Sequence, residues 1–325
     1  MAVYLLGSRG PEVTQIQEAL SAQHLYSGSP DGVFGGGTES AVRAFQFSQQ
    51  LKADGKVGPE TWSKLFGVDV DDVPVPEMTT KPIDHQCLAL TGAIETGHPP
   101  PDCFAGLSGD FDDQGISFGA LQWNIGQGTL QPLLAQMKES HPDQLSDMFG
   151  SNYDALVAML GESRDEQLSW AQSIQDPIRH VLFEPWRGLF QTLGRTQEFQ
   201  DIETQAAAGI FHAAMDLCTE YNVSSQRAAA LMFDIKVQNG GVKSWVKSQI
   251  LSDFNQLDGN GMSDADREEA QLRIIATRVA ASANPKWVAD VQNRKLTIAN
   301  GEGVIHGCHY NLEDQYGITL NPAAA

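Results

Sequence analysis

The first part of the chain alternates short amphipathic segments with glycine-containing turns. Val13, Ile16 and Leu20 recur at spacings of three and four, which is typical of one face of a helix. Two further turns, "DGVFG" at 31–35 and "DGKVG" at 54–58, each precede another segment with helical spacing. Glycine suits turn positions that need a positive φ. The pattern predicts three short helices around one small core.

The second and third of these helices have identifiable starts. We expect the second helix to begin with Thr38 as its N-cap, and the third to open at Pro59. The apolar side chains expected to face the core are Val42, Phe45, Phe47, Trp62, Leu65 and Phe66.

Residues 68–83 interrupt this pattern. Three prolines and several acidic residues predict an extended, solvated linker. From Asp84 onward apolar residues return at helical spacing, most clearly over 199–222, and strand-like alternation is scarce. The prediction is a mainly α protein: a small three-helix domain over 1–67, a linker over 68–83, and an α-rich domain over 84–325. This last domain is of α+β type, with one small hairpin near the acidic stretch "GDFDDQGISFG".

Charge and composition exclude some partners. The chain of 325 residues carries a formal charge of −20. We expect no nucleic-acid partner, because neutralising phosphates needs clustered Lys and Arg. No stretch approaches the ~18 apolar residues of a membrane span, so membrane insertion is not expected. The N-terminus lacks a basic start followed by an apolar run, so the sequence predicts no Sec signal peptide.

Cysteine and histidine spacing does not predict a metal site. The four cysteines, Cys87, Cys103, Cys218 and Cys308, form no CxxC pair. There is no HExxH motif, and the group of His306, Cys308 and His309 lacks zinc spacing. Cys87 and Cys103 flank Glu95, where a disulfide and two buried free thiols both remain open.

Glu95 is the main candidate for chemistry. It follows Leu88, Ala89 and Ala93 near the end of a largely apolar helix. Desolvation and the negative end of a helix dipole both favour a protonated carboxyl, the form that a general acid needs. An ordinary solvated acid at a helix end is the alternative.

Residues 2–67 carry a specific order of motifs. After "GSRG" come Asp31-Gly32, Phe34-Gly35 and Thr38, then Phe45-Gln46, then Asp54-Gly55, Gly58 and Thr61-Trp62. This order resembles the three-helix peptidoglycan-binding domain that accompanies many wall hydrolases. The resemblance implies a wall anchor without catalysis. Asp31, Phe34 and Asp54 are its candidate wall contacts.

A second resemblance covers about thirty residues. The series Glu95, Asp113-x-Gly115, Phe118-Gly119 and Gln122 resembles a pattern of the lysozyme superfamily, which includes goose-type lysozymes, lytic transglycosylases and chitosanases. "VQNGG" at 237–241 resembles the Asn-x-Gly turn found later in two of these families. The resemblance implies a lysozyme-like catalytic domain.

Glycoside hydrolysis needs an acid and a second group that activates water or stabilises charge. We assign Glu95 as the acid and Asp113 as the base, with Asp112 and Asp110 as substitutes. A gap of ~6.5–9.5 Å between the two carboxyl groups would favour inversion. A solvated acidic turn and a cation-binding loop are the alternatives for all three aspartates.

Other residues are candidates for supporting roles. Ser117 is expected to hold the loop or to bond the acid. Gln122 is expected to bind substrate amide groups, as the resemblance implies. Trp123 is a sugar-stacking floor or a core residue, and Asn239 lines the opposite wall. Tyr310 or His306 is a cleft residue or packs in a loop.

Together these features predict a peptidoglycan hydrolase, an endolysin-like N-acetylmuramidase that needs no cofactor. It would act as a monomer on the bacterial wall, in the periplasm or outside the cell, after holin-dependent release or another secretion route. The alternatives are a lytic transglycosylase, a chitosanase-like glycosidase and a non-catalytic wall-binding protein. A Cys–His amidase is disfavoured, because Cys103 does not follow a glycine turn at a helix start. No G-x-S-x-G elbow or phosphate-binding loop is present.

Overall fold

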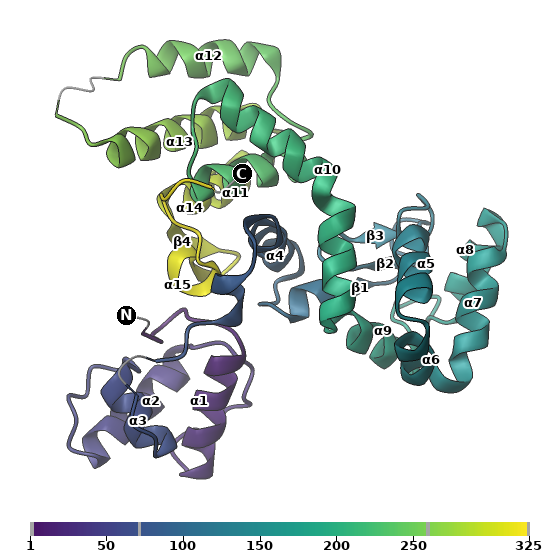
Figure 1. Cartoon of the computed structure of the whole chain (residues 1–325), viewed down its shortest axis with the longest axis horizontal. Helices are drawn as coiled ribbons and strands as arrows, with labels where there is room; N and C mark the ends of the chain where they lie inside the picture. Colours follow the sequence, from purple (N-terminus) through teal and green to yellow (C-terminus); the bar gives the residue numbers. More distant parts are fainter. Residues whose placement is uncertain (1–2, 71–72, 258–260, 324–325) are drawn as a thin grey trace. The chain divides into compact units, whose positions relative to one another are not determined.

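The computed structural model describes residues 3–70, 73–257 and 261–323. They form two compact units (Figure 1). Unit 1 combines Met1–Gln86 with Ala213–Ala325, and unit 2 is Cys87–His212. Helices dominate both units, which confirms the prediction of a mainly α protein. None of the helices in the described part of the chain has the length and apolar character needed to cross a bilayer.

The N-terminal part of unit 1 contains the three predicted helices, α1 (Pro11–Ala22), α2 (Gly36–Ser48) and α3 (Pro59–Phe66). Their core includes Val13, Ile16, Leu20, Phe34, Val42, Phe45 and Trp62. Two expectations are wrong in detail. Phe47 is 81% exposed, because Phe45, two residues earlier and so on the opposite face of α2, is the side chain that enters the core. The N-cap of α2 is Gly35, and Thr38 lies inside the helix.

A buried glutamine organises the first turn of this domain. Gln17 on α1 donates from Nε2 to Asp31 Oδ1 at 2.9 Å and contacts Thr38 Oγ1 at 3.0 Å. Its Oε1 accepts the N–H of Gly32 at 2.9 Å. Gly32 has a φ of 69°, and a Cβ there would lie 3.1 Å from the carbonyl oxygen of Gly10. The side-chain amide of Gln17 therefore provides hydrogen-bond partners for the groups of this turn from inside the core.

Gln46 on α2 repeats the arrangement one helix later. Its Nε2 contacts Asp54 Oδ1 and Thr61 Oγ1, both at 3.1 Å, and its Oε1 accepts the N–H of Gly55 at 2.9 Å. The recurring unit is a helical Gln, an Asp-Gly turn and a Thr in the next helix. The two "DG" turns of the sequence are thus built by the same hydrogen bonds.

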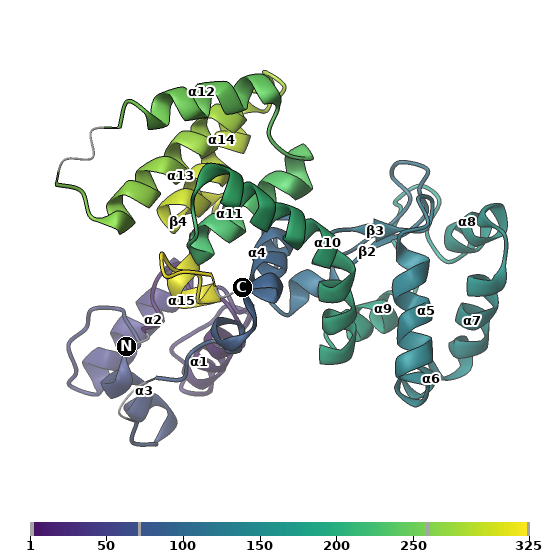
Figure 2. The ribbon, with the colours of Figure 1, turned by 45° about the horizontal axis from the view of Figure 1, so that its top comes forward.

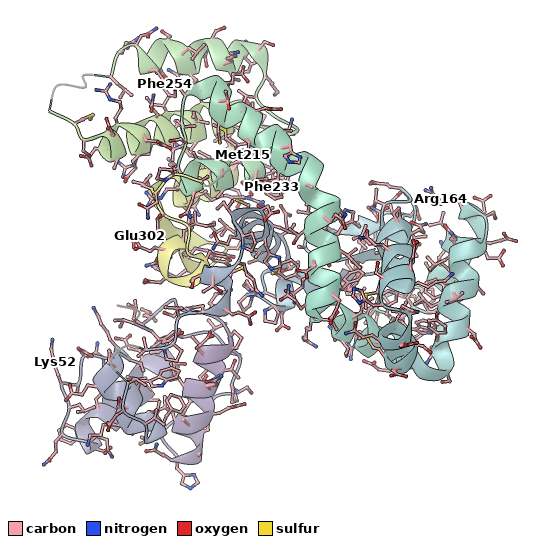
Figure 3. All side chains as sticks on the ribbon, viewed as in Figure 1. Lys52, Arg164, Met215, Phe233, Phe254 and Glu302 are labelled. Carbon is pink, nitrogen blue, oxygen red and sulfur yellow. The ribbon has the colours of Figure 1, made fainter. Side chains whose placement is uncertain are left out.

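The remainder of unit 1 is helical with one hairpin. Its helices are α11 (Gln226–Asn239), α12 (Ser244–Phe254), α13 (Asp264–Ala281), α14 (Val288–Asn300) and the short α15 (Leu312–Tyr316) and η1 (Glu77–Thr80). Strands β4 (Glu302–Ile305) and β5 (Cys308–Asn311) pair antiparallel, with Glu302 opposite Asn311. α14 packs against α13, α11 and β4. Phe233, labelled on α11 in Figure 3, is fully buried in this unit.

A buried ion cluster ties α11 to α14. Asp234 is fully buried, and its Oδ1 accepts from Arg294 Nε at 2.9 Å while its Oδ2 accepts from Lys295 Nζ. Burial acts to raise the pKa of Asp234, but the charges of Arg294 and Lys295 outweigh it and lower the pKa to about 2. Removing one member of such a cluster leaves an uncompensated buried charge, so the three residues constrain how the two helices pack.

Unit 2 is built around a three-stranded antiparallel sheet in the order β1 (Leu107–Ser108), β2 (Ser117–Phe118) and β3 (Trp123–Asn124). The sequence predicted one small hairpin near the acidic stretch, and the structure has this three-stranded sheet there. Figure 2 shows α5 beside β3, with α7 and α8 beyond it. Phe118 centres the core, with its ring 5.2 Å from that of Phe190 and 5.4 Å from that of Phe199. The helices of this unit are α5 (Leu130–Ser140), α6 (Pro142–Phe149), η3 (Gly150–Asn152), α7 (Tyr153–Gly161), α8 (Arg164–Ser173), α9 (Trp186–Gly194) and η2 (Asp102–Ala105).

Two helices contain residues of both units. α4 (Ile83–Thr96) contributes its residues from Cys87 onward to unit 2. α10 (Gln197–Tyr221) contributes its residues up to His212. This second helix matches the long helical segment predicted over 199–222.

Replacing Gln46 with Ala should destabilise the three-helix domain by about 2–3 kcal/mol, because it leaves the Gly55 N–H and the Thr61 hydroxyl unsatisfied. Urea unfolding followed by hydrogen exchange of residues 54–61 measures the effect. The matched control is Gln49→Ala, since Gln49 is exposed and its side chain has, among the described residues, a single hydrogen bond, to Ser48. Equal losses in both variants would contradict a structural role for Gln46.

Candidate active site

Glu95 lies in the last turn of α4. Leu88, Ala89 and Ala93 are buried, as the apolar pattern predicted, and the helix ends before Gly97 at a φ of 74°. The carboxyl group of Glu95 itself is exposed. The expectation that it is shielded from water is therefore wrong for the protein without a ligand. The side chain stands at the C-terminal, negative end of the helix.

The end of α4 lies against the β-sheet because two glycines lack a Cβ. A Cβ on Gly92 would lie 2.7 Å from that of Ala120. A Cβ on Gly106 would lie 2.5 Å from Thr96 Cγ2 and 3.1 Å from Gln122 Nε2. These separations are below ordinary contact distances. The helix end that carries Glu95 is therefore adjacent to the turn between β2 and β3, formed by residues 119–122.

Gln122 holds this turn together. Its Nε2 donates to the carbonyl oxygens of Gly119 at 2.9 Å and Gly106 at 3.2 Å, and its Oε1 accepts from Ser108 Oγ at 2.8 Å. Its backbone has a φ of 54°, which is uncommon for a residue other than glycine. Both N–H groups and one lone pair of the amide already form hydrogen bonds within the protein. One lone pair of Oε1 remains able to accept a further hydrogen bond.

Asp110 anchors the acidic loop. It is buried, its Oδ1 accepts the N–H of Gly115 at 2.8 Å, and its Oδ2 accepts from Gln172 Nε2 at 2.9 Å. Its own N–H donates to Gln175 Oε1 at 2.8 Å. Asp110 therefore acts as a structural link to the end of α8 and is a poor substitute for the base.

Asp112 and Asp113 lie at the exposed tip of the same loop. Asp112 Oδ1 accepts the N–H of Gln114 at 3.3 Å. Asp113 has a φ of 60°, and within the described ranges its carboxylate has no hydrogen-bond or ion-pair partner. Of the three aspartates, Asp113 is thus the one whose acceptor capacity is open to a ligand or water.

Ser117 and Trp123 lie on the sheet. Ser117 is half-buried in β2, opposite Ser108 and Asn124. Trp123 is half-buried in β3 and packs against the core of unit 2, so part of its ring serves the core. Farther along, Arg164 at the start of α8 donates to the carbonyl oxygen of Gly126, beside the sheet (Figure 3).

The other two substrate-binding candidates belong to unit 1. Asn239 is exposed at the end of α11. Tyr310 is only 2% exposed in β5, where the Arg9 guanidinium lies 5.8 Å from its ring centre. His306 is exposed and lies 2.8 Å from Asp290. Tyr310 is therefore a packing residue, which was the alternative given in the sequence prediction. In this conformation its side chain is not accessible to a substrate.

The three candidate wall contacts also have structural tasks. Oδ1 of Asp31 accepts a hydrogen bond from the buried amide of Gln17, and Oδ1 of Asp54 accepts one from that of Gln46. Phe34 is fully buried and offers no surface to a glycan. Exposed Phe47, which the sequence placed in the core, is an aromatic side chain that this domain presents to solvent.

Glu203 on α10 was missed by the sequence interpretation. It is fully buried, and burial raises its pKa well above the usual range of a glutamate. Its Oε2 accepts the N–H of Ala120 at 2.9 Å, so it touches the 119–122 turn. One signal was present, because Glu203 follows Phe199 by four residues and so shares its buried helix face.

The described cysteines form no disulfide, and the described side chains offer no metal cluster. Cys87 and Cys103 are both buried thiols, which decides between the two alternatives for this pair. Across the described ranges, no group of three His, Cys, Asp or Glu side chains could hold a metal ion.

Comparison with known proteins identifies the N-terminal part. Residues 9–65 match the family model of the peptidoglycan binding domain. The chain has a peptidoglycan-binding domain at its N-terminus.

Curated relatives extend this similarity to named lytic enzymes. The chain is 41% identical over 180 residues to a spore cortex-lytic enzyme of Oceanobacillus iheyensis, a match that covers 55% of this chain and 62% of the relative. It is 41% identical over 59 residues to a spore cortex-lytic enzyme of Halalkalibacterium halodurans, covering 18% of each protein. The chain thus spans less than two thirds of the length of these relatives.

Similar solved structures are distant in sequence. A chitosanase from Bacillus subtilis MY002 has a TM-score of 0.43 at 12% identity, over 74% of this chain and 92% of that one. A chitosanase of Gynuella sunshinyii in complex with chitotetraose has a TM-score of 0.38 at 12% identity, over 68% and 87% of the two chains.

Replacing Asp110 with Ala should release the acidic loop, because the Gly115 N–H and the Gln172 amide lose a buried acceptor. The expected loss of stability is about 1–3 kcal/mol. Hydrogen exchange of residues 110–115 in the full chain should accelerate. Asp112→Ala is the control, since that side chain is exposed, and its exchange should stay near wild type. Matching exchange in the two variants would remove Asp110 as the anchor.

Proposed function

We propose that the chain is a peptidoglycan hydrolase of the N-acetylmuramidase type. It would cleave the β-1,4 bond between N-acetylmuramic acid and N-acetylglucosamine. The observation that carries the proposal is the peptidoglycan-binding domain at residues 9–65. The similarity to proteins named spore cortex-lytic enzymes supports wall degradation as the task. An attached binding domain raises the local concentration of its polymer around the catalytic unit.

In the proposed mechanism Glu95 donates its proton to the glycosidic oxygen as the bond to C1 breaks. Asp113 takes a proton from a water molecule, whose oxygen forms the new bond to C1. The exposed position of Glu95 and the open acceptor capacity of Asp113 support these roles. A carboxyl separation of ~6.5–9.5 Å in the substrate complex would give inversion, and ~5–5.5 Å would give retention.

Neighbouring residues would shape the site around these two groups. Gln122 and Ser108 keep the 119–122 turn closed beside α4. The exposed part of Trp123 would carry a sugar ring, with Ser117 beside it on the sheet. Asn239 remains a proposed contact. The reaction needs no cofactor, and we propose that a monomer acts on the wall outside the cytoplasm.

Digestion of purified sacculi, with masses of the soluble products, tests the proposal. A muramidase releases fragments with a hydrated reducing end, whereas a lytic transglycosylase releases anhydro fragments that are lighter by one water. Activity on chitosan and none on sacculi would identify a chitosanase-like enzyme instead. Binding to sacculi without any release would leave a non-catalytic wall-binding protein.

Replacing Glu95 with Gln should abolish the release of soluble fragments, because an amide cannot donate the proton that the leaving oxygen needs. Binding to sacculi should persist, since residues 9–65 form the binding domain. Pelleting and product masses measure the two properties separately. Glu139→Gln, an exposed glutamate on α5, is the matched control. Wild-type release by Glu95→Gln would exclude Glu95 as the acid.

Replacing Asp113 with Asn should lower kcat by about 10²–10⁴-fold if the carboxylate activates water. Asp112→Asn, one residue away on the same exposed loop, should cost far less. Initial rates on a soluble glycan fragment give kcat for both variants. The reverse order would transfer the role to Asp112, and a small loss in both would favour transglycosylation.

A further inference from the structure

The side chain of Glu203 is in an unusual position for a glutamate. It is fully buried, its Oε2 accepts one hydrogen bond, from the N–H of Ala120 at 2.9 Å, and its Oε1 has no partner among the described residues. No cation pairs with it in that part of the chain. An isolated ionised carboxylate is very costly to bury, so burial favours the protonated form and raises the pKa of this group.

The carboxyl group is packed directly against the 119–122 turn. Gly119 has a φ of 86°, and a Cβ there would lie 2.5 Å from Glu203 Oε1. The N–H of Gly119 donates to the carbonyl oxygen of Gly106 at 2.8 Å, and that of Gln122 to the carbonyl oxygen of Gly119 at 3.2 Å. The turn is thus held by Glu203 from α10 and by Gly106 at the end of η2.

The opposite side of the turn contacts the candidate acid's helix. Ala120 lies against Gly92, which precedes Glu95 by three residues on α4. A continuous line of contacts therefore runs from the Glu203 carboxyl through Ala120 to the last turn of α4. On the basis of the proposed function, we infer that Glu203 is a positioning residue that holds the 119–122 turn, and through it the end of α4, in the geometry that catalysis needs.

The ionisable surroundings of Glu203 are sparse. The turn itself has no ionisable side chain. From η2, the Cys103 thiol is fully buried, and burial, then Glu203, then Asp102 raise its pKa. Asp102 is paired with Arg195 at 2.6 Å. On α10 itself the neighbouring acid is Asp201, which is exposed and accepts from Gln197. None of these groups supplies a positive charge to a Glu203 carboxylate.

The direction of the pH effect follows from these surroundings. Because burial raises the pKa of Glu203 in the folded protein, its contribution to stability is fully present below the pKa of an unfolded glutamate, ~4.3. It is lost as the pH rises through the folded pKa. Ionisation would then place an unpaired charge against Gly119 and loosen the turn. The stability of the wild type should therefore fall on the alkaline side.

The test compares Glu203→Gln and Glu203→Leu in the full chain. Gln keeps the shape and an acceptor for the Ala120 N–H but cannot ionise. Leu removes the acceptor. We expect Glu203→Gln to retain most of the wild-type kcat near acid pH and to lose the alkaline fall in stability. We expect Glu203→Leu to lower kcat by at least about 10-fold with little change in KM, and to speed exchange of the Ala120 amide.

Asp201→Asn is the matched control on the same helix and should behave as wild type. An unchanged alkaline fall in the stability of Glu203→Gln, or wild-type exchange and kcat in Glu203→Leu, would overturn the inference. Should Glu203→Leu fail to fold, the pH dependence of stability in Glu203→Gln still tests the inference. Should the wild type release nothing from sacculi, the proposed function fails, while exchange of Ala120 and the pH dependence of stability still test the positioning of the turn.

Discussion

The candidate active site depends on one close approach, that of α4 to the turn at residues 119–122. Gly92 and Gly106 permit it, because a Cβ at either position would overlap a neighbouring side chain. Ala120 and Thr96 fill the space that the glycines leave. Without this contact the end of α4 would lie away from the sheet, and Glu95 would have no fixed relation to Gln122 or to the acidic loop. The small residues therefore matter for geometry, although they carry no chemistry.

Buried polar side chains hold the glycine-containing turns by hydrogen bonds. Some of these side chains have a hydrogen bond at every polar atom, and one does not. Gln17, Gln46 and Gln122 each use both ends of the amide, donating to one side of a turn and accepting from another. Such groups rigidify a turn at little cost, since they are satisfied. Glu203 uses one oxygen and leaves the other unpaired. Of these four buried side chains, the one with an unsatisfied oxygen therefore lies next to the candidate site.

Local patterns in the sequence predicted the helices well. Spacing and glycine turns were enough for α1 to α3 and for the long helix α10, because these depend on neighbouring residues. They failed where a long-range contact decides. Thr38 is taken into the network of Gln17, and Tyr310 is covered by Arg9 from the start of the chain. Glu203 could be placed on a buried face from its spacing to Phe199, but its partner Ala120 lies 83 positions away in sequence.

The exposure of Glu95 changes what the substrate must contribute to the proposed site. In the free protein the residue is exposed, so the apolar face of α4 does not cover it. A sugar chain lying over the end of α4 would exclude water from this helix end. On the proposed mechanism the substrate thus completes the environment that the acid needs. A rigid support for α4 then becomes more important, because the covering sugar must meet the carboxyl group at a fixed place.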